Sequence, residues 1–191
     1  MTDRPRYRLL GPLEVRRDGA DRPVTGPQQR ALLAVLLAHR GRAVTDDVLV
    51  DTLWPDGPPP SARHTLRAHV SRLRTLVGDD VRTLDGGYVL DVPPDATDAG
   101  AFEAMVRAAG AQAPRDTVVT LEQALALWHG PAFGRAAELA PVAAAARHLD
   151  GLRLDALHAL AAATSACAAM ASASSANAAR PHTALTTWCP A

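Results

Sequence analysis

Four arginines recur between residues 61 and 78, a stretch that contains no aspartate or glutamate: Arg63, Arg67, Arg72 and Arg74. Arginine carries a planar, permanently charged guanidinium that donates several hydrogen bonds to phosphate oxygens or to the edge of guanine. Arginines gathered without acidic neighbours can therefore bind a polyanion such as the DNA backbone. A solvated basic surface is the alternative, and charge alone does not decide between the two.

The same stretch has the apolar spacing of one amphipathic helix. We expect its buried stripe to consist of Ala62, Leu66, Val70, Leu73 and Val77. Ser61 is a candidate N-cap, and Gly78 is a candidate stop. The opposite face is expected to carry the short and basic side chains that suit the major groove: His64, Arg67, Ala68, Ser71, Arg74 and Thr75.

Three arginines of this helix have competing interpretations. Arg67 and Arg74 are expected to point outward and are predicted DNA contacts, with a solvated arginine as the alternative. Arg72 lies nearer the core edge. For Arg72, contact with a phosphate and an intramolecular ion pair with Asp79 or Asp80 explain the position equally well.

The elements around this helix must position it. Ahead of it, the pattern predicts two short strands, Tyr7–Leu10 and Leu13–Arg17, and a third strand near Val24. Two helices follow, one over Gln28–His39 and one from Thr45 to Trp54. Thr45 is a good N-cap for the second of these helices, and Pro55 prevents its continuation. Behind the basic helix, Val81–Leu84 and Tyr88–Val92 flank Asp85-Gly86-Gly87, which is the pattern of a β-hairpin.

This order of elements predicts a winged helix-turn-helix over residues 1–94. A small antiparallel sheet precedes three helices, and the hairpin that follows is the wing. In such a domain the third helix enters the major groove, and the hairpin contacts the neighbouring backbone or minor groove.

Residues 95–162 are predicted to form a separate, all-α domain after the linker Pro93-Pro94-Asp95. Helices are expected over Ala99–Ala109, with Asp98 as the cap, and over Thr117–Trp128 and Pro141–Ala163. Antiparallel helix pairs of this size are typical of a tetratricopeptide-like array. The whole chain is therefore assigned to the α+β class. Its last part, residues 163–191, is rich in Ala, Ser and Thr and is expected to be a low-complexity tail that is either disordered or a helix only partly docked.

The composition excludes several classes of protein. The chain of 191 residues has a formal net charge of +0 and no lysine, so a P-loop nucleotide-binding site cannot form within it. Its two cysteines give no metal pattern, and His64 and His69 are poorly spaced for a shared metal ion. We therefore predict no enzyme activity, no cofactor and no metal. His69, Trp54 and Trp128 are expected to be packing residues.

A signal peptide and a run of about 20 apolar residues are not expected. The predicted location is the cytoplasm, on the nucleoid, and no membrane partner is expected.

Several collinear motifs resemble the Streptomyces antibiotic regulatory protein family of actinobacterial transcriptional activators. The matching segments are Leu10–Val15, Gly26–Leu33, Leu53–Pro55, Ser61–Leu66, Val70–Arg74, Gly87-Tyr88 and Leu125–Ala132. The resemblance implies an OmpR-type winged helix followed by a bacterial transcriptional activation domain. It also implies sequence-specific binding to promoter repeats of secondary-metabolite (antibiotic) gene clusters as a homodimer or oligomer, and contact with RNA polymerase.

Carried onto this chain, the resemblance places DNA contacts on the third helix and on the wing. The helix would supply Arg63, His64, Thr65, Arg67, Ser71, Arg72 and Arg74, and the wing would supply Arg82 and Thr83. A receiver domain ahead of the winged helix is not expected, and neither is the usual phosphorylation control.

Two departures from the family support a second hypothesis. Leu84 stands where the family often has an arginine in the wing, and the helical domain is shorter than usual, as a truncated or frame-shifted reading frame would produce. The alternative function is a protein-interaction module, or a fragment, with weak or no DNA binding.

Overall fold

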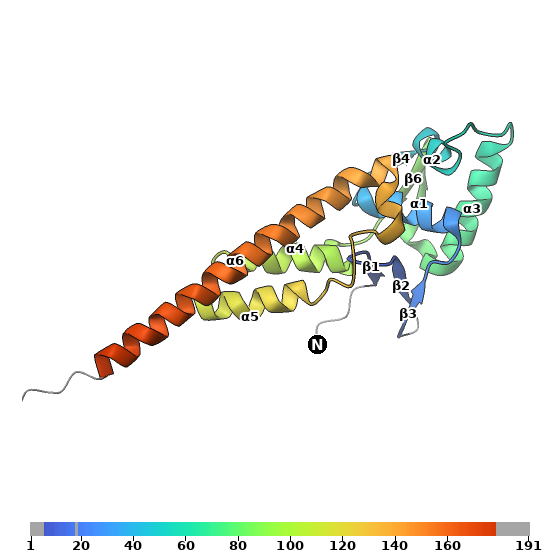
Figure 1. Ribbon diagram of the computed structural model, residues 1–191. Helices are drawn as coiled ribbons and strands as arrows, with labels where there is room; N and C mark the ends of the chain where they lie inside the picture. The colour runs from blue at the N-terminus through green and yellow to red at the C-terminus, as the bar shows by residue number, and fades with distance from the viewer. Residues whose placement is uncertain (1–5, 18, 179–191) are drawn as a thin grey trace, which may run out of the picture.

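A computed structural model describes residues 6–17 and 19–178. The molecule has a head of small sheets and helices, from which the long helix α6 (Ala140–Ala178) extends diagonally beside α4 and α5 (Figure 1). The described elements confirm the predicted class, an N-terminal winged helix followed by an all-α part.

The N-terminal sheet consists of three short antiparallel strands in the order β1-β2-β3: Tyr7–Arg8, Glu14–Arg17 and Ala20–Pro23. The predicted third strand near Val24 is β3, which ends one residue before Val24. Arg16 and Asp21 face each other across β2 and β3, with Nε and Oδ1 2.8 Å apart. The adjacent Arg16 guanidinium lowers the pKa of the Asp21 carboxyl.

Three helices form the centre of the head: α1 (Pro27–Ala38), α2 (Asp46–Leu53) and α3 (Ala62–Val77). Thr45 caps α2 as predicted, because its hydroxyl accepts from the Val48 amide at 3.4 Å. The five predicted apolar residues of α3 are all buried, and Gly78 ends the helix. Ser61 is the N-cap residue of α3 as predicted, but its hydroxyl makes no capping hydrogen bond; its carbonyl accepts from the Thr65 amide.

The wing is a three-stranded sheet in the order β4-β6-β5, with strands Val44–Thr45, Val81–Leu84 and Gly87–Leu90 for β4, β5 and β6. The sequence predicted the hairpin of β5 and β6 but missed β4, which has only two residues. Gly87 is needed here, because a Cβ at this position would collide with the Val44 carbonyl of the neighbouring strand. Gly86 supplies the left-handed turn residue of the hairpin, with φ +73°.

The second half contains two short 3₁₀ segments and the helices α4 to α6. Their bounds are η2 Pro94–Ala96, α4 Asp98–Ala109, α5 Pro114–Leu125, η3 Gly134–Glu138 and α6 Ala140–Ala178. Trp128 is a core residue as expected, and its ring packs edge-on against Phe102 with centroids 5.4 Å apart.

The last part of the chain continues as helix. Of the two alternatives for residues 163–191, a disordered tail or a partly docked helix, the second holds for the described part, because α6 continues without a break through Ala178; alanine-rich sequence favours helix even where few side chains are buried. Residues 179–191 of that expected tail lie outside the described part. In addition, by length and composition alone, the segment Ala140–Ser172 could cross a membrane, with mean hydropathy 1.3 in its most apolar window. In the structure this helix packs on α5, α4 and α1.

Asp98 does not cap α4 with its side chain. Thr97 does so, since its hydroxyl accepts from the Gly100 amide at 2.9 Å. The Asp98 carboxylate is instead buried, with 3% of the residue exposed, and accepts from the amides of Leu9 at 2.8 Å and Leu10 at 3.1 Å. Burial raises the pKa of Asp98, and these amide hydrogen bonds act in the opposite direction.

The carbonyls of the same two residues are also bound by the helical half. The Phe133 amide donates to Leu9 at 2.6 Å, and the His129 amide donates to Leu10 at 2.8 Å. All four backbone polar groups of Leu9 and Leu10 are thus paired with residues more than 80 positions away in the sequence. The predicted boundary near residue 94 remains a prediction, but the two halves share these buried contacts.

We predict that Asp98→Asn lowers the free energy of unfolding by about 1–3 kcal/mol. The asparagine keeps one acceptor, but its NH₂ group faces a buried amide that is left without a partner. Urea unfolding followed by circular dichroism measures the change. The exposed Asp95→Asn serves as the control and should stay within about 0.5 kcal/mol of the wild type; equal stabilities of both variants would contradict the role given to Asp98.

Candidate nucleic-acid interface

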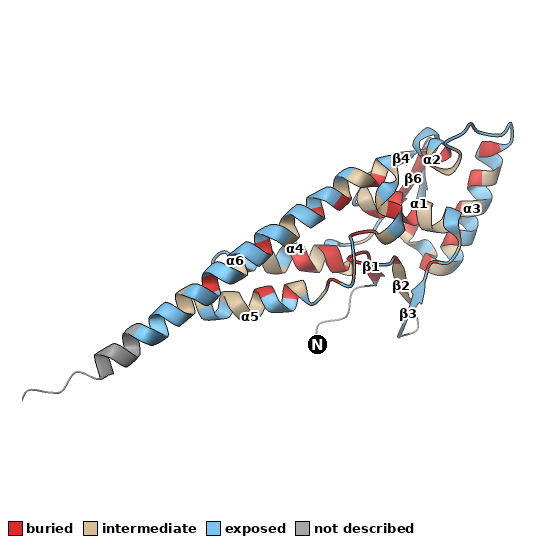
Figure 2. Cartoon of the chain, in the orientation of Figure 1, coloured by how far each residue is buried: buried red, intermediate tan, exposed pale blue. Residues whose placement is uncertain are grey.

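Helix α3 lies at the outer edge of the head, away from α6 (Figure 1). One side of it packs on α1 and α2, and the other side is exposed (Figure 2). The exposed positions include most of the face predicted from the sequence: His64, Arg67, Ala68, Ser71 and Thr75. The structure therefore presents an acid-free, arginine-bearing helix surface to the solvent.

Arg67 lies near the middle of this surface. It is exposed and makes no hydrogen bond or ion pair with any residue that the structure describes. Ala68 and Ser71 are its short, exposed neighbours. A guanidinium with free donors beside small side chains can approach a base edge or a phosphate without first breaking an internal contact.

Arg74 differs from Arg67, although the sequence placed both on the outer face. It is half-buried, and its Nε donates to the Val81 carbonyl at 3.0 Å while Nη2 donates to the Thr83 hydroxyl at 2.8 Å. The expectation that Arg74 projects outward like Arg67 was therefore wrong, because strand β5 packs beside the last turns of α3. Arg74 positions the wing against the helix and adds positive charge at their junction.

Two other arginines of α3 lie on its flanks. Arg63 is exposed and pairs with the exposed Asp47 of α2, with Nη2 and Oδ1 2.7 Å apart. Such an exposed pair contributes little stability, so a phosphate can replace the carboxylate at low cost. Arg72 is also exposed, and the structure shows no ion pair for it within the described residues.

The proposed partner of Arg72 is engaged elsewhere. Asp80 pairs with Arg6 at 2.9 Å and accepts a hydrogen bond from the Tyr7 hydroxyl. Burial, and then this hydrogen bond, raise the pKa of the Tyr7 hydroxyl. Of the two interpretations of Arg72, the ion pair with Asp79 or Asp80 is absent from the described contacts, and phosphate binding stays a prediction.

The remaining helix residues are less uniform than the sequence indicated. Thr65 is half-buried, and its hydroxyl donates to the Ser61 carbonyl at 3.2 Å. His69 lies at the core edge as expected, with its ring 6.3 Å from that of Trp54. Burial and the nearby Arg72 lower the pKa of His69, so its imidazole is neutral at pH 7.

On the wing, Arg82 and Thr83 point to opposite faces of β5, as successive residues of a strand do. Thr83 faces α3 and binds Arg74, whereas Arg82 pairs with Asp91 of the chain after β6 at 2.6 Å. Leu84 shares the face of Arg82 and is 40% exposed. The two predicted wing contacts are therefore not brought together.

Two residues near this surface were missed from the sequence. Arg17 of β2 donates a hydrogen bond to the Thr75 carbonyl, which brings a further guanidinium to the C-terminal end of α3. Tyr88 of β6 is buried, and burial and Asp46 raise its pKa while Arg67 and Arg74 lower it. Both depend on contacts between distant segments, so no local pattern could have indicated them. Among the described residues, no group of three or more His, Cys, Asp or Glu could hold a metal ion.

Two family descriptions match the sequence. Residues 22–90 match "Transcriptional regulatory protein, C terminal", and residues 97–190 match "Bacterial transcriptional activator domain". The second match includes most of residues 163–191, the segment that was predicted to be a low-complexity tail. The families are of transcriptional regulators, which are not enzymes.

Curated relatives agree with these matches. The chain is 38% identical over 136 residues to the transcriptional regulatory protein EmbR of Mycobacterium tuberculosis, covering 65% of this chain and 35% of EmbR. It is 33% identical over 164 residues to the transcriptional regulator RedD of Streptomyces coelicolor, covering 80% of this chain and 47% of RedD. It is 35% identical over 138 residues to the regulatory protein AfsR of Streptomyces griseus, covering 69% of this chain and 14% of AfsR.

A solved structure is similar to the fold. Mycobacterium tuberculosis EmbR in complex with a low-affinity phosphopeptide superimposes with a TM-score of 0.76 at 34% identity, covering 86% of this chain and 46% of that one. The chain thus spans less than half the length of these relatives.

We predict that Arg74→Ala loosens the wing and lowers the free energy of unfolding by about 1–2 kcal/mol, because the Val81 carbonyl and the Thr83 hydroxyl lose their donor. Amide hydrogen exchange of Val81–Leu84 should become faster. The exposed Arg72→Ala is the matched control, with little effect on either quantity. Unchanged exchange in β5 would show that Arg74 does not position the wing.

Proposed function

The chain belongs to the Streptomyces antibiotic regulatory protein family of transcriptional regulators, and from this we propose that it binds promoter DNA in a sequence-specific manner through α3 and the wing. The observation that carries the proposal is Arg67, exposed and unpaired among the described residues on an acid-free helix face. The proposed action takes place in the cytoplasm, on the nucleoid.

The DNA contacts divide into two proposed kinds. Arg67, His64 and Ser71 share the outward face of α3 and are placed to meet base edges. Arginines on the flanks of α3 and on the wing are placed to meet phosphates: Arg63, Arg72, Arg74 and Arg82. The hydroxyls of Thr65 and Thr83 already form hydrogen bonds within the chain, with the Ser61 carbonyl and with Arg74. We therefore propose that these two threonines support the interface by positioning the start of α3 and Arg74.

The helical half supports the activating part of the proposal. Helices α4 to α6 match a transcriptional activator domain, and α6 offers a long exposed surface (Figure 2). We propose that this domain contacts RNA polymerase and supports pairing of subunits on promoter repeats, and that the controlled genes belong to a secondary-metabolite cluster.

A protein-interaction module with weak DNA binding is the second candidate. The exposed Leu84 favours it, because it stands on a wing surface where an arginine would reach DNA. Replacing this residue separates the two functions. If the wing approaches DNA, Leu84→Arg should strengthen binding severalfold at low salt, and if the chain does not bind DNA, the same substitution should have no effect.

We predict that Arg67→Ala weakens binding to a selected site about 5- to 150-fold, which corresponds to the 1–3 kcal/mol of a bidentate base contact. The duplex is first selected from a random pool by the wild-type chain, and direct repeats should be enriched. Fluorescence anisotropy measures the affinity. Arg115→Ala on α5 is the control arginine and should bind like the wild type.

We predict a different signature for Arg72→Ala. A lost phosphate contact should weaken binding to selected and random duplexes alike and reduce the slope of log K against log salt by about 1. Arg67→Ala should instead reduce the ratio of selected to random affinity. Failure of the wild-type chain to enrich any sequence, or equal affinities of wild type and both variants, would remove the DNA-binding proposal and favour the second candidate.

A further inference from the structure

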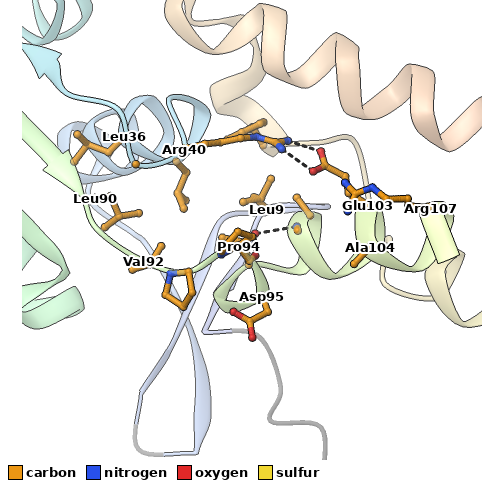
Figure 3. A pocket seen from close by; sticks show the side chains of 17 residues that line it. Leu9, Leu36, Arg40, Leu90, Val92, Pro94, Asp95, Glu103, Ala104 and Arg107 are labelled. Atoms are coloured by element: carbon orange, nitrogen blue, oxygen red, sulfur yellow. Dashed lines mark hydrogen bonds and ion pairs between the residues drawn. The ribbon is translucent and has the colours of Figure 1, made fainter.

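A cavity of about 420 Å³ lies between the winged helix and the helical half (Figure 3). Its size falls within the range of small-molecule sites, roughly 300–1,000 Å³, and such sites are common where two domains meet. We propose that this cavity binds a small, mostly apolar molecule that carries one anionic group. This ligand site is separate from the α3 surface and does not depend on it.

The walls of the cavity explain the apolar part of the ligand. Leu36 and Leu37 come from the end of α1, Leu90 and Val92 from β6 and the chain after it, and Leu9 and Phe133 from the junction of the two halves. Figure 3 shows Leu36, Leu90 and Val92 on the side opposite α4. A hydrocarbon group placed among these side chains would be removed from water on several sides.

The charges on the rim explain the anionic group. Arg40, after α1, reaches Glu103 of α4, with its two terminal nitrogens 2.6 and 2.5 Å from the carboxylate oxygens. Arg107 follows one turn later on α4, lines the same cavity and has no ion pair among the described residues. Arg40 is thus neutralised by Glu103, whereas the charge of Arg107 is not, and a ligand carboxylate can bind Arg107 at this end.

The other end of the cavity fixes the orientation of the ligand. Asp95 lies on the opposite rim, away from Arg107 (Figure 3), so an anionic group is repelled there. The apolar part of the ligand then points toward the leucines. Because the walls come from both halves of the chain, an occupied cavity stabilises their present arrangement by mass action.

Binding can be tested on the full chain with 8-anilinonaphthalene-1-sulfonate, a fluorescent apolar anion, as the probe. We expect saturable fluorescence at one site per chain and competition by octanoate. Octanol, which lacks the charge, should compete more weakly, and octylamine, which has the opposite charge, should compete least. Octanoate should also raise the midpoint of thermal unfolding of the wild type.

Variants locate the probe. Ala104 is an exposed residue of α4 that lines the cavity, so Ala104→Phe fills the cavity from a position that the core does not use and should weaken binding more than about tenfold. Val92→Phe fills it from the opposite wall and checks the result independently. Arg107→Ala should weaken binding about 3- to 10-fold, and Arg115→Ala, on α5 outside the cavity, should leave it unchanged. Circular dichroism confirms that each variant is folded.

Two results would overturn the proposal. One is probe binding that neither Ala104→Phe nor Val92→Phe weakens. Loss of that binding in Leu154→Glu, on the exposed side of α6, would then place the probe on α6 instead of in the cavity. The other is equal competition by octanoate and octylamine, which would remove the anionic recognition. Neither result depends on DNA binding, so this proposal and the proposed function can fail separately.

Discussion

The buried carboxylate of Asp98 is the constraint on which the arrangement of the two halves depends. It holds the amides of Leu9 and Leu10, and the carbonyls of these two residues accept from the loop that precedes η3. Residues of the N-terminal sheet region thus satisfy their backbone groups outside their own domain. A buried ionised group is tolerated only when its oxygens accept hydrogen bonds, and here the amides of Leu9 and Leu10 donate to them.

The sequence predicted the parts of the molecule that local physics determines. The buried stripe of α3, the cap at Thr45 and the stop at Gly78 all result from side chains acting on their own helix. Predictions failed where a partner in another element determines the contacts of a side chain. Asp98 was predicted to cap its own helix and Arg74 to point into solvent, but their partners lie outside their helices, 89 and 9 residues away. Strand β4 is too short to give a pattern of its own and exists because β6 pairs with it.

The same distinction applies to the candidate interface. Arg67 and Ser71 were placed on the exposed face by periodicity alone, and the structure agrees. The ion pairs of Arg63 and Arg82 with Asp47 and Asp91 could not be predicted, because they depend on how α2 and the wing pack beside α3. The predicted arginines therefore divide into Arg67 and Arg72, whose guanidiniums have no acceptor among the described residues, and Arg63, Arg74 and Arg82, which must exchange an internal acceptor for a phosphate. This division follows from tertiary packing and has no equivalent in the charge pattern of the helix.

Helix α6 contains 39 residues and therefore extends about 58 Å at 1.5 Å per residue. Its first turns pack near α1, and its later turns run along α5 (Figure 1). In a rod of this length, a tilt of about 5° at the end beside α1 displaces the far end by about 5 Å. A small change in the packing of α6 against α1 would therefore be amplified into a larger displacement at the distal end of the helix.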